Sequence, residues 1–266
     1  MKKLFALLLS IFLLFAVSSC GDKESDVPSE DIFFTVTFIT SSLPYDVTPP
    51  ESAIVKQGDA ASRPTLDVGP SAGYVVIWTK DRETKKEYDF SASVEENLTL
   101  YAVEIPRTYE VKYLFDVEGA TNHPKNITTF TKETETFLLK APSVPFGYHF
   151  EKWAYANNPE STVESIEKGT EHNVFLRAVI TPVEYMITYF VAGDTNPNPS
   201  TYLFGDTLSL ESPLRDGFDF IGYTIMGDSD NTPVTTLTAG FILEHRDTLF
   251  RENGTIGLKA NWEAKS

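Results

Sequence analysis

The chain has 266 residues, of which 41% are hydrophobic and 13% aromatic, and its formal net charge is −16. Val, Thr, Tyr and Phe recur while helical periodicity is rare, so we predict a β-rich α+β fold. With 38 acidic against 22 basic residues, the surface repels phosphates, which argues against a nucleic-acid partner.

The N-terminus has the features of a targeting segment. Lys2 and Lys3 precede an apolar run, Leu4–Val17, which is too short to span a membrane comfortably as a mature helix. Cys20 follows small residues and is the single cysteine of the chain, so no internal disulfide can form. This arrangement resembles the lipobox of bacterial lipoproteins, in which that cysteine receives lipid such as palmitate. We therefore expect a lipoprotein signal peptide over residues 1–19; an ordinary secretory signal with an incidental cysteine is the alternative.

Residues 20–31 are polar, acidic and without aromatics, which predicts a disordered tether after the lipidated cysteine. An acidic run at this place resembles the signal that directs lipoproteins of Bacteroidota-type bacteria to the outer face of the outer membrane. The resemblance implies a lipid-anchored protein on the outer membrane, facing the cell exterior. The alternative is a solvated spacer on the periplasmic side.

A glycine followed by an aromatic strand occurs three times in the rest of the chain. Gly73, Gly147 and Gly217 are 74 and 70 positions apart. Each glycine suits the positive φ of a tight turn. The segments that recur are Ala72–Trp78, Pro145–Trp153 and Asp216–Tyr223. Repetition at this period predicts three tandem modules of one type.

The first module, residues 32–105, begins with alternating apolar and polar residues, as a half-buried strand does. Its predicted strands are Phe33–Ile39, Gly73–Trp78 and Asn97–Val103, and a further strand ends in a turn over Ile54–Asp59. A short helix or turn is predicted at Lys86–Val94.

The second and third modules repeat this order over residues 106–181 and 182–266. The boundaries fall at Ile105-Pro106 and Thr181-Pro182, since proline cannot donate to a sheet ladder. The third module is longer, and Phe241–Phe250 has apolar residues at helical spacing. We expect this insertion to form a binding site or a cap.

These motifs are similar to those of the Listeria–Bacteroides repeat, a B-repeat type module of bacterial surface proteins. The best Gly-Tyr-x-Phe-x-x-Trp is Gly147–Trp153, Leu98–Ala102 gives the closing Leu-Thr-Leu-Tyr-Ala, and Ala260 and Trp262 end the third copy. The resemblance extends from about Ile32 to Glu263. It implies β-grasp-like (ubiquitin-like) modules at the cell surface, with roles in spacing, adhesion or partner binding and no catalytic residues.

The recurring aromatics are candidates either for the core or for stacking on sugar rings. Recurrence at equivalent points favours the core, because a repeated fold needs the same side chains in every copy. The residues concerned are Tyr74, Trp78, Tyr148, Phe150, Trp153, Phe218, Phe220, Tyr223 and Trp262.

Other chemistry has weak support. The histidines (His123, His149, His172 and His245) lack metal-ligand spacing. The run from Asp228 to Asn231 begins like a calcium loop, but Ala239 stands where the bidentate Glu belongs, which favours a polar turn. Thr207 and Thr248 lie in Asp-Thr-Leu, which resembles an O-glycosylation acceptor. We expect no metal, cofactor or catalytic centre.

The sequence therefore favours a non-catalytic cell-surface lipoprotein that presents tandem repeat modules for adhesion or for binding an extracellular protein or glycan. Two alternatives remain. One is a structural stalk or accessory subunit of a fimbrial or glycan-uptake assembly; the other is a hydrolase with a cryptic carboxylate pair in one module.

Overall fold

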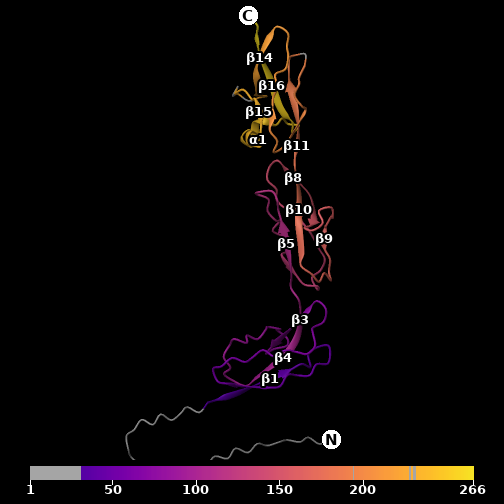
Figure 1. The fold of residues 1–266 in the computed structure, drawn as a ribbon, viewed down its shortest axis with the longest axis vertical. Coiled ribbons are helices and arrows are strands. Elements are labelled where there is room, and N and C mark those ends of the chain that lie inside the picture. Colours follow the sequence, from indigo (N-terminus) through magenta and orange to yellow (C-terminus); the bar gives the residue numbers. More distant parts are fainter. Residues whose placement is uncertain (1–30, 194, 228, 230–231) are drawn as a thin grey trace, which may run out of the picture. The chain divides into compact units, whose positions relative to one another are not determined.

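The computed structural model describes residues 31–193, 195–227, 229 and 232–266. Cys20, the predicted signal peptide and nearly all of the predicted tether lie outside them. Strands dominate the described chain, and two short helices occur near the C-terminal end (Figure 1). The predicted β-rich class is confirmed. None of the helices in these ranges is long and apolar enough to cross a membrane.

The first sheet has the order β2-β1-β4-β3. Its strands are β1 (Phe33–Ile39), β2 (Ala53–Lys56), β3 (Tyr74–Thr79) and β4 (Leu98–Pro106). β1 lies antiparallel to β2 and parallel to β4. The first strand of this segment therefore pairs directly with its last, and the glycine-initiated strand lies at the edge beside β4.

The second and third sheets have the same order, β6-β5-β10-β8 and β12-β11-β16-β14. The strands of the second are β5 (Tyr109–Leu114), β6 (Thr129–Phe130), β8 (Tyr148–Tyr155) and β10 (Val174–Pro182). Those of the third are β11 (Glu184–Phe190), β12 (Thr201–Leu203), β14 (Phe218–Ile225) and β16 (Ile256–Ala264). Pro106 and Pro182, predicted at boundaries, are the last residues of β4 and β10.

Equivalent residues pair across the parallel centre of each sheet. The first residue pairs of the three parallel ladders are Val36–Leu98, Val111–Val174 and Ile187–Ile256. All six side chains are buried. This register fixes which residues correspond in the three sheets.

One aromatic pair recurs in the core beside this pairing. The pairs are Phe38–Trp78, Tyr113–Trp153 and Tyr189–Tyr223, with ring centroids 5.1, 5.1 and 5.5 Å apart. Trp78, Trp153 and Tyr223 are at most 3% exposed. Aromatic pairs of this geometry stabilise a core beyond the area that they bury.

The edge beside each buried aromatic is covered by the chain that follows it. The carbonyl oxygens of Trp78, Trp153 and Tyr223 accept from the backbone N–H groups of Tyr88, Val163 and Val234 at 2.7, 2.9 and 2.6 Å. An exposed strand edge is a site of unwanted pairing. The returning chain therefore shields the same part of the edge in all three sheets.

Two further pairs of short strands and the helices complete the described chain. β7 (Phe137–Leu138) pairs with β9 (Ser165–Ile166), and β13 (Leu208–Ser209) pairs with β15 (Thr236–Leu237). The predicted helix is present as α1 (Ala239–Glu244) and α2 (Arg246–Leu249). The Thr238 side chain caps α1 by accepting from the Phe241 N–H. The segment Lys86–Val94, predicted as a short helix or turn, contains a turn and no helix, and the Ala92 N–H donates to the Asp89 carbonyl at 3.1 Å.

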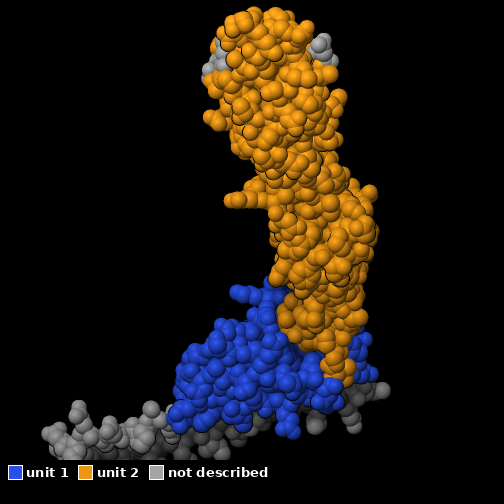
Figure 2. Space-filling model, turned by 45° about the horizontal axis from the view of Figure 1, so that its top comes forward, with its two compact units in different colours: residues 1–67, 78–102 blue, residues 68–77, 103–266 orange. Residues whose placement is uncertain are grey.

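By its internal contacts the chain divides into two compact units, drawn in different colours in Figure 2. The first contains the described residues up to Asp67 together with Trp78–Ala102. The second contains Val68–Ile77 and Val103–Ser266, and so holds the whole second and third sheets.

The half-buried phenol of Tyr113 makes the second sheet less stable as the pH rises in the alkaline range. Burial raises its pKa to about 12, whereas an unfolded tyrosine titrates near 10. Stability that needs the neutral phenol is therefore complete below pH 10 and is lost as the pH rises towards 12. We expect Tyr113→Phe to flatten the fall in unfolding free energy over this interval, measured by urea denaturation at each pH.

Phe38 holds the equivalent edge-to-face contact without a hydroxyl, so the substitution keeps the packing. It removes the hydrogen bond to the Ile127 carbonyl (3.0 Å), which costs about 1 kcal/mol at neutral pH. Tyr155→Phe, at an exposed tyrosine, is the matched control. Equal pH dependence in both variants would contradict the assignment.

Candidate binding surfaces

The structure divides the predicted aromatics between full and partial burial. Trp78, Trp153 and Tyr223 are buried, as described above. The others are half-buried: Tyr74, Tyr148, Phe150, Phe218, Phe220 and Trp262. Several of them contact the buried three, as Phe150 does with Trp153 (5.4 Å between centroids) and Phe220 with Tyr223 (5.0 Å). Phe150 and Phe220 therefore contribute to the packing within their sheets.

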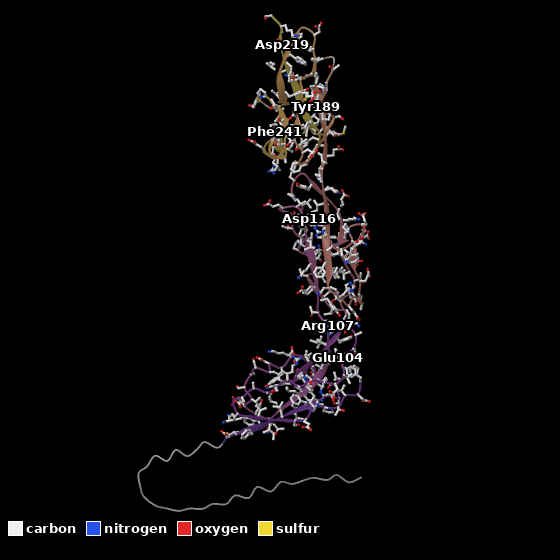
Figure 3. The ribbon with its side chains drawn as sticks, viewed as in Figure 1. Glu104, Arg107, Asp116, Tyr189, Asp219 and Phe241 are labelled. Atoms are coloured by element: carbon white, nitrogen blue, oxygen red, sulfur yellow. The ribbon has the colours of Figure 1, made fainter. Side chains whose placement is uncertain are left out.

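A backbone hydrogen bond recurs where each sheet ends. The carbonyl groups of Gly73, Gly147 and Gly217 accept from the N–H groups of Arg107, Val183 and Lys265 at 2.8, 2.9 and 3.0 Å. Figure 3 marks Arg107. The glycines have φ of +73°, +86° and +75°, which side chains with a Cβ rarely adopt. The predicted role of these glycines in tight turns is confirmed.

Aromatic side chains from the end of the second sheet pack against the third. Phe146 stacks on Tyr185 (6.2 Å between centroids) and meets Phe250 edge-on (5.9 Å). Tyr148 meets Phe204 edge-on at 5.4 Å. Phe250 directly follows α2, so the insertion of the third sheet contributes to this aromatic junction. The predicted insertion therefore contacts the end of the second sheet through Phe250.

Tyr74 in the first sheet and Phe218 in the third are the counterparts of Tyr148, and both have polar partners. Lys132 corresponds to Phe204, since each lies two residues after the hairpin partner of an equivalent tyrosine. Lys132 lies 5.2 Å from the Tyr74 ring centroid and donates to the Ala72 carbonyl. The Tyr74 hydroxyl donates to Glu133 (2.8 Å), and this hydrogen bond raises the Tyr74 pKa. Arg215 lies 3.7 Å from the centroid of Phe218. Cations thus cover aromatic faces at these two positions.

A cleft of about 420 Å³ opens at the second sheet, between the end of β8 and the start of β10. Its lining consists of Tyr155, Ala156, Asn157, His172, Asn173, Val174 and Phe175. Tyr155 and Phe175 are 41% and 44% exposed. The Lys112 ammonium lies 5.7 Å from the Phe175 ring centroid.

The backbone around this cleft is already hydrogen-bonded within the protein. The Ala156 N–H donates to the Phe175 carbonyl, and the Tyr155 N–H donates to the Ser161 hydroxyl, both at 2.8 Å. Asn173 Oδ1 accepts from the Glu110 N–H at 2.9 Å, which orients its amide. Within the described residues, Asn157 and His172 have no side-chain partner. The cleft therefore presents amide and imidazole groups between two aromatic rings.

Metal-binding clusters are absent from the described residues. No group of three or more His, Cys, Asp or Glu side chains there has the arrangement to hold an ion. Asp228, Asp230 and Asn231 of the calcium-like run lie outside the described residues, and Ala239 begins α1. Of the histidines, His172 lines the cleft and His245 stacks on Phe241 (4.2 Å; Phe241 is labelled in Figure 3).

The two threonines in Asp-Thr-Leu runs, Thr207 and Thr248, are both exposed. Thr248 donates to the His245 carbonyl at 3.3 Å.

Tyr155 and Phe175 do not belong to the set of aromatics that recurs in the sequence, so the repeat pattern does not predict them. What distinguishes these two side chains is that they do not recur. Each is an aromatic at a position where the other two copies have none, and the copies can be compared only once the strand register is known.

Residues 34–103 match the model of the Listeria-Bacteroides repeat domain. The match runs from the second residue of β1 into β4, and so includes most of the first sheet. No curated protein matches the chain. The comparison supports the predicted repeat over this segment.

The absence of a Cβ at Gly147 lets the Phe204 ring approach closely, whereas no side chain approaches its counterpart Gly217. A Cβ at Gly147 lies 2.5 Å from the buried Phe204 ring, while a Cβ at Gly217 has no atom within 4 Å. We expect Gly217→Ala to cost about 1 kcal/mol for the left-handed backbone. Gly147→Ala costs about 1–3 kcal/mol more from overpacking. Urea unfolding of both variants measures the difference, and equal costs would show that Phe204 does not pack tightly on Gly147.

Proposed function

We propose that this chain is a non-catalytic, surface-exposed lipoprotein that presents three tandem repeat modules for adhesion or for binding a protein or glycan. The observation that carries the proposal is that one sheet order and one set of buried residues occur three times. The match over residues 34–103 supports a surface-associated, non-catalytic module for the first copy. The shared register supports extending that assignment to the second and third.

The β-grasp likeness belongs to the same proposal. A mixed sheet with its first and last strands parallel at the centre is similar to the ubiquitin-like arrangement. The chain departs from it in one respect, since helices are described beside the third sheet alone. We assign the modules to residues 32–105, 106–181 and 182–266.

Attachment through Cys20 to the outer membrane completes the proposal. Each buried methylene of an acyl chain contributes about 0.8 kcal/mol to membrane binding. The acidic tether then places the modules outside the cell, where they meet extracellular partners.

The test is protease treatment of intact cells that express the full chain. We expect the protein to be degraded while a periplasmic marker survives, and Cys20→Ala to release the protein from the membrane fraction. Survival of the protein until the cells are lysed would establish the periplasmic orientation instead. Membrane retention of Cys20→Ala would rule out the lipid anchor.

A structural stalk is the second candidate, and the aromatic junction between the second and third sheets favours it. Phe146 contacts Tyr185, Phe204 and Phe250 at centroid distances of 5.9–6.2 Å. Contacts of three rings with one side chain restrict the movement of one sheet against the other.

Spin labels on the second and third sheets test this restriction. In the chain from Gly21 onward, which lacks cysteine, Glu160→Cys and Lys259→Cys provide two labelling sites. We expect one narrow distance distribution, which broadens when Phe146→Ala is added. Phe33→Ala, at a phenylalanine of β1 that is 56% exposed, is the control and leaves the distribution unchanged. A broad distribution in the parent chain would exclude the stalk.

A further inference from the structure

Two exposed aromatics of the second sheet occupy positions that the repeated fold does not require to be aromatic. Phe175 faces Lys112 across the parallel pairing, and the residues that correspond to Phe175 are Thr99 and Gly257. The first and third sheets form the same pairing with those small residues. The Phe175 ring is therefore dispensable for the sheet.

Tyr155 is likewise specific to the second sheet. It lies two residues after the buried Trp153 and pairs with Leu176. The third sheet has Ile225 at this position, paired with Leu258. Two residues after Trp78 in the first sheet is Lys80. The three copies thus contain an aromatic, an aliphatic and a charged residue at one position.

Large rings that are 41% and 44% exposed leave apolar surface in water and gain less from burial than the rings of the core. When such rings flank one cleft and are absent from equivalent positions, packing does not account for them. Ligand sites in proteins combine apolar or aromatic walls with a few convergent polar groups. The cleft between Tyr155 and Phe175 has this composition.

The lining of the cleft also lacks negatively charged side chains. It contains no Asp or Glu, although 38 of the 266 residues are acidic. Three other clefts of about 320–420 Å³ each include at least one carboxylate: Asp81 in one, Asp46 in another and Glu151 in the third. A cleft without carboxylates does not favour a cationic ligand.

The lining groups also favour binding over hydrolysis. Most glycoside hydrolases use two carboxyl groups that flank the scissile bond, and the lining supplies neither. The Asn157 amide and the His172 imidazole can both donate and accept hydrogen bonds. The hydroxyl groups of a sugar also donate and accept hydrogen bonds. The faces of the Tyr155 and Phe175 rings suit the C–H face of a sugar ring.

We propose that this cleft binds an uncharged pyranose of a neutral glycan, with its ring against Phe175 or Tyr155 and its hydroxyls bonded to Asn157, His172 and the Asn173 amide nitrogen. The inference rests on the proposed binding function and names its ligand class and site. The first and third modules, which lack both rings, do not share this site.

The test is fluorescence polarisation with the full-length protein in detergent. The probes are fluorescein-labelled neutral hexasaccharides of glucose, mannose, galactose and N-acetylglucosamine, and an anionic hexagalacturonate. We expect saturable binding of at least one neutral probe. Phe175→Thr, which installs the residue of the first sheet, weakens it about tenfold or more, the equivalent of about 1.4 kcal/mol. Tyr155→Lys, which also installs the residue of the first sheet, has an effect in the same direction.

Phe33→Thr is the matched control, since it removes an exposed phenylalanine elsewhere and leaves the affinity unchanged. Thermal unfolding of each variant shows that the fold persists. The inference is overturned by any of three results: no neutral probe binds, binding survives both cleft variants, or hexagalacturonate binds more tightly. Each of these results leaves the protease result on intact cells unaffected. Failure of the proposed glycan site can therefore be distinguished from failure of the proposed surface function.

Discussion

The structure depends on the parallel pairing of the first strand of each sheet with its closing strand. In the first sheet this pairing joins Val36 to Leu98. Parallel strands need a long connection, and here the connection carries both the hairpin strand and the glycine-initiated strand. The aromatic pair beside the pairing, such as Phe38 with Trp78, closes the core. Because these contacts are distant in sequence, a core forms only when the whole copy has folded.

Once this core exists, the remaining positions are open to different uses. Lys132 lies two positions after Phe130, the hairpin partner of Tyr109, and Phe204 lies two positions after Tyr202, the hairpin partner of Tyr185. Lys132 binds a backbone carbonyl and lies beside an aromatic face, whereas Phe204 packs against Tyr148 and over Gly147. One position in the fold thus supports a polar contact in one copy and an apolar junction in the next. The third copy strengthens its junction with Phe250, a residue of its own insertion.

Recurrence also distinguishes side chains that the shared fold requires from side chains that it does not require. Asn97 and Asn173 accept the same backbone hydrogen bond in the first two sheets, so the Asn173 oxygen has a structural role. Phe175 and Tyr155 have no aromatic counterpart, and their rings remain exposed beside a cleft. A shared core lets such differences accumulate at little cost, because surface substitutions change stability by less than about 0.5 kcal/mol.

The amino-acid sequence predicts the β-rich class, the turn glycines and the helical insertion, because strand alternation, positive φ and helical spacing are local properties, and it predicts the triplication because one pattern recurs along the chain. It did not determine the register of the parallel pairing, which joins residues more than sixty positions apart, and so it could not show which aromatics correspond. The prediction treated Trp153 and Tyr148 alike, whereas only the tertiary structure buries the first and places the second at a junction. The cleft depends on the same register: Tyr155 and Phe175 are twenty positions apart in sequence and become neighbours because β8 lies beside β10.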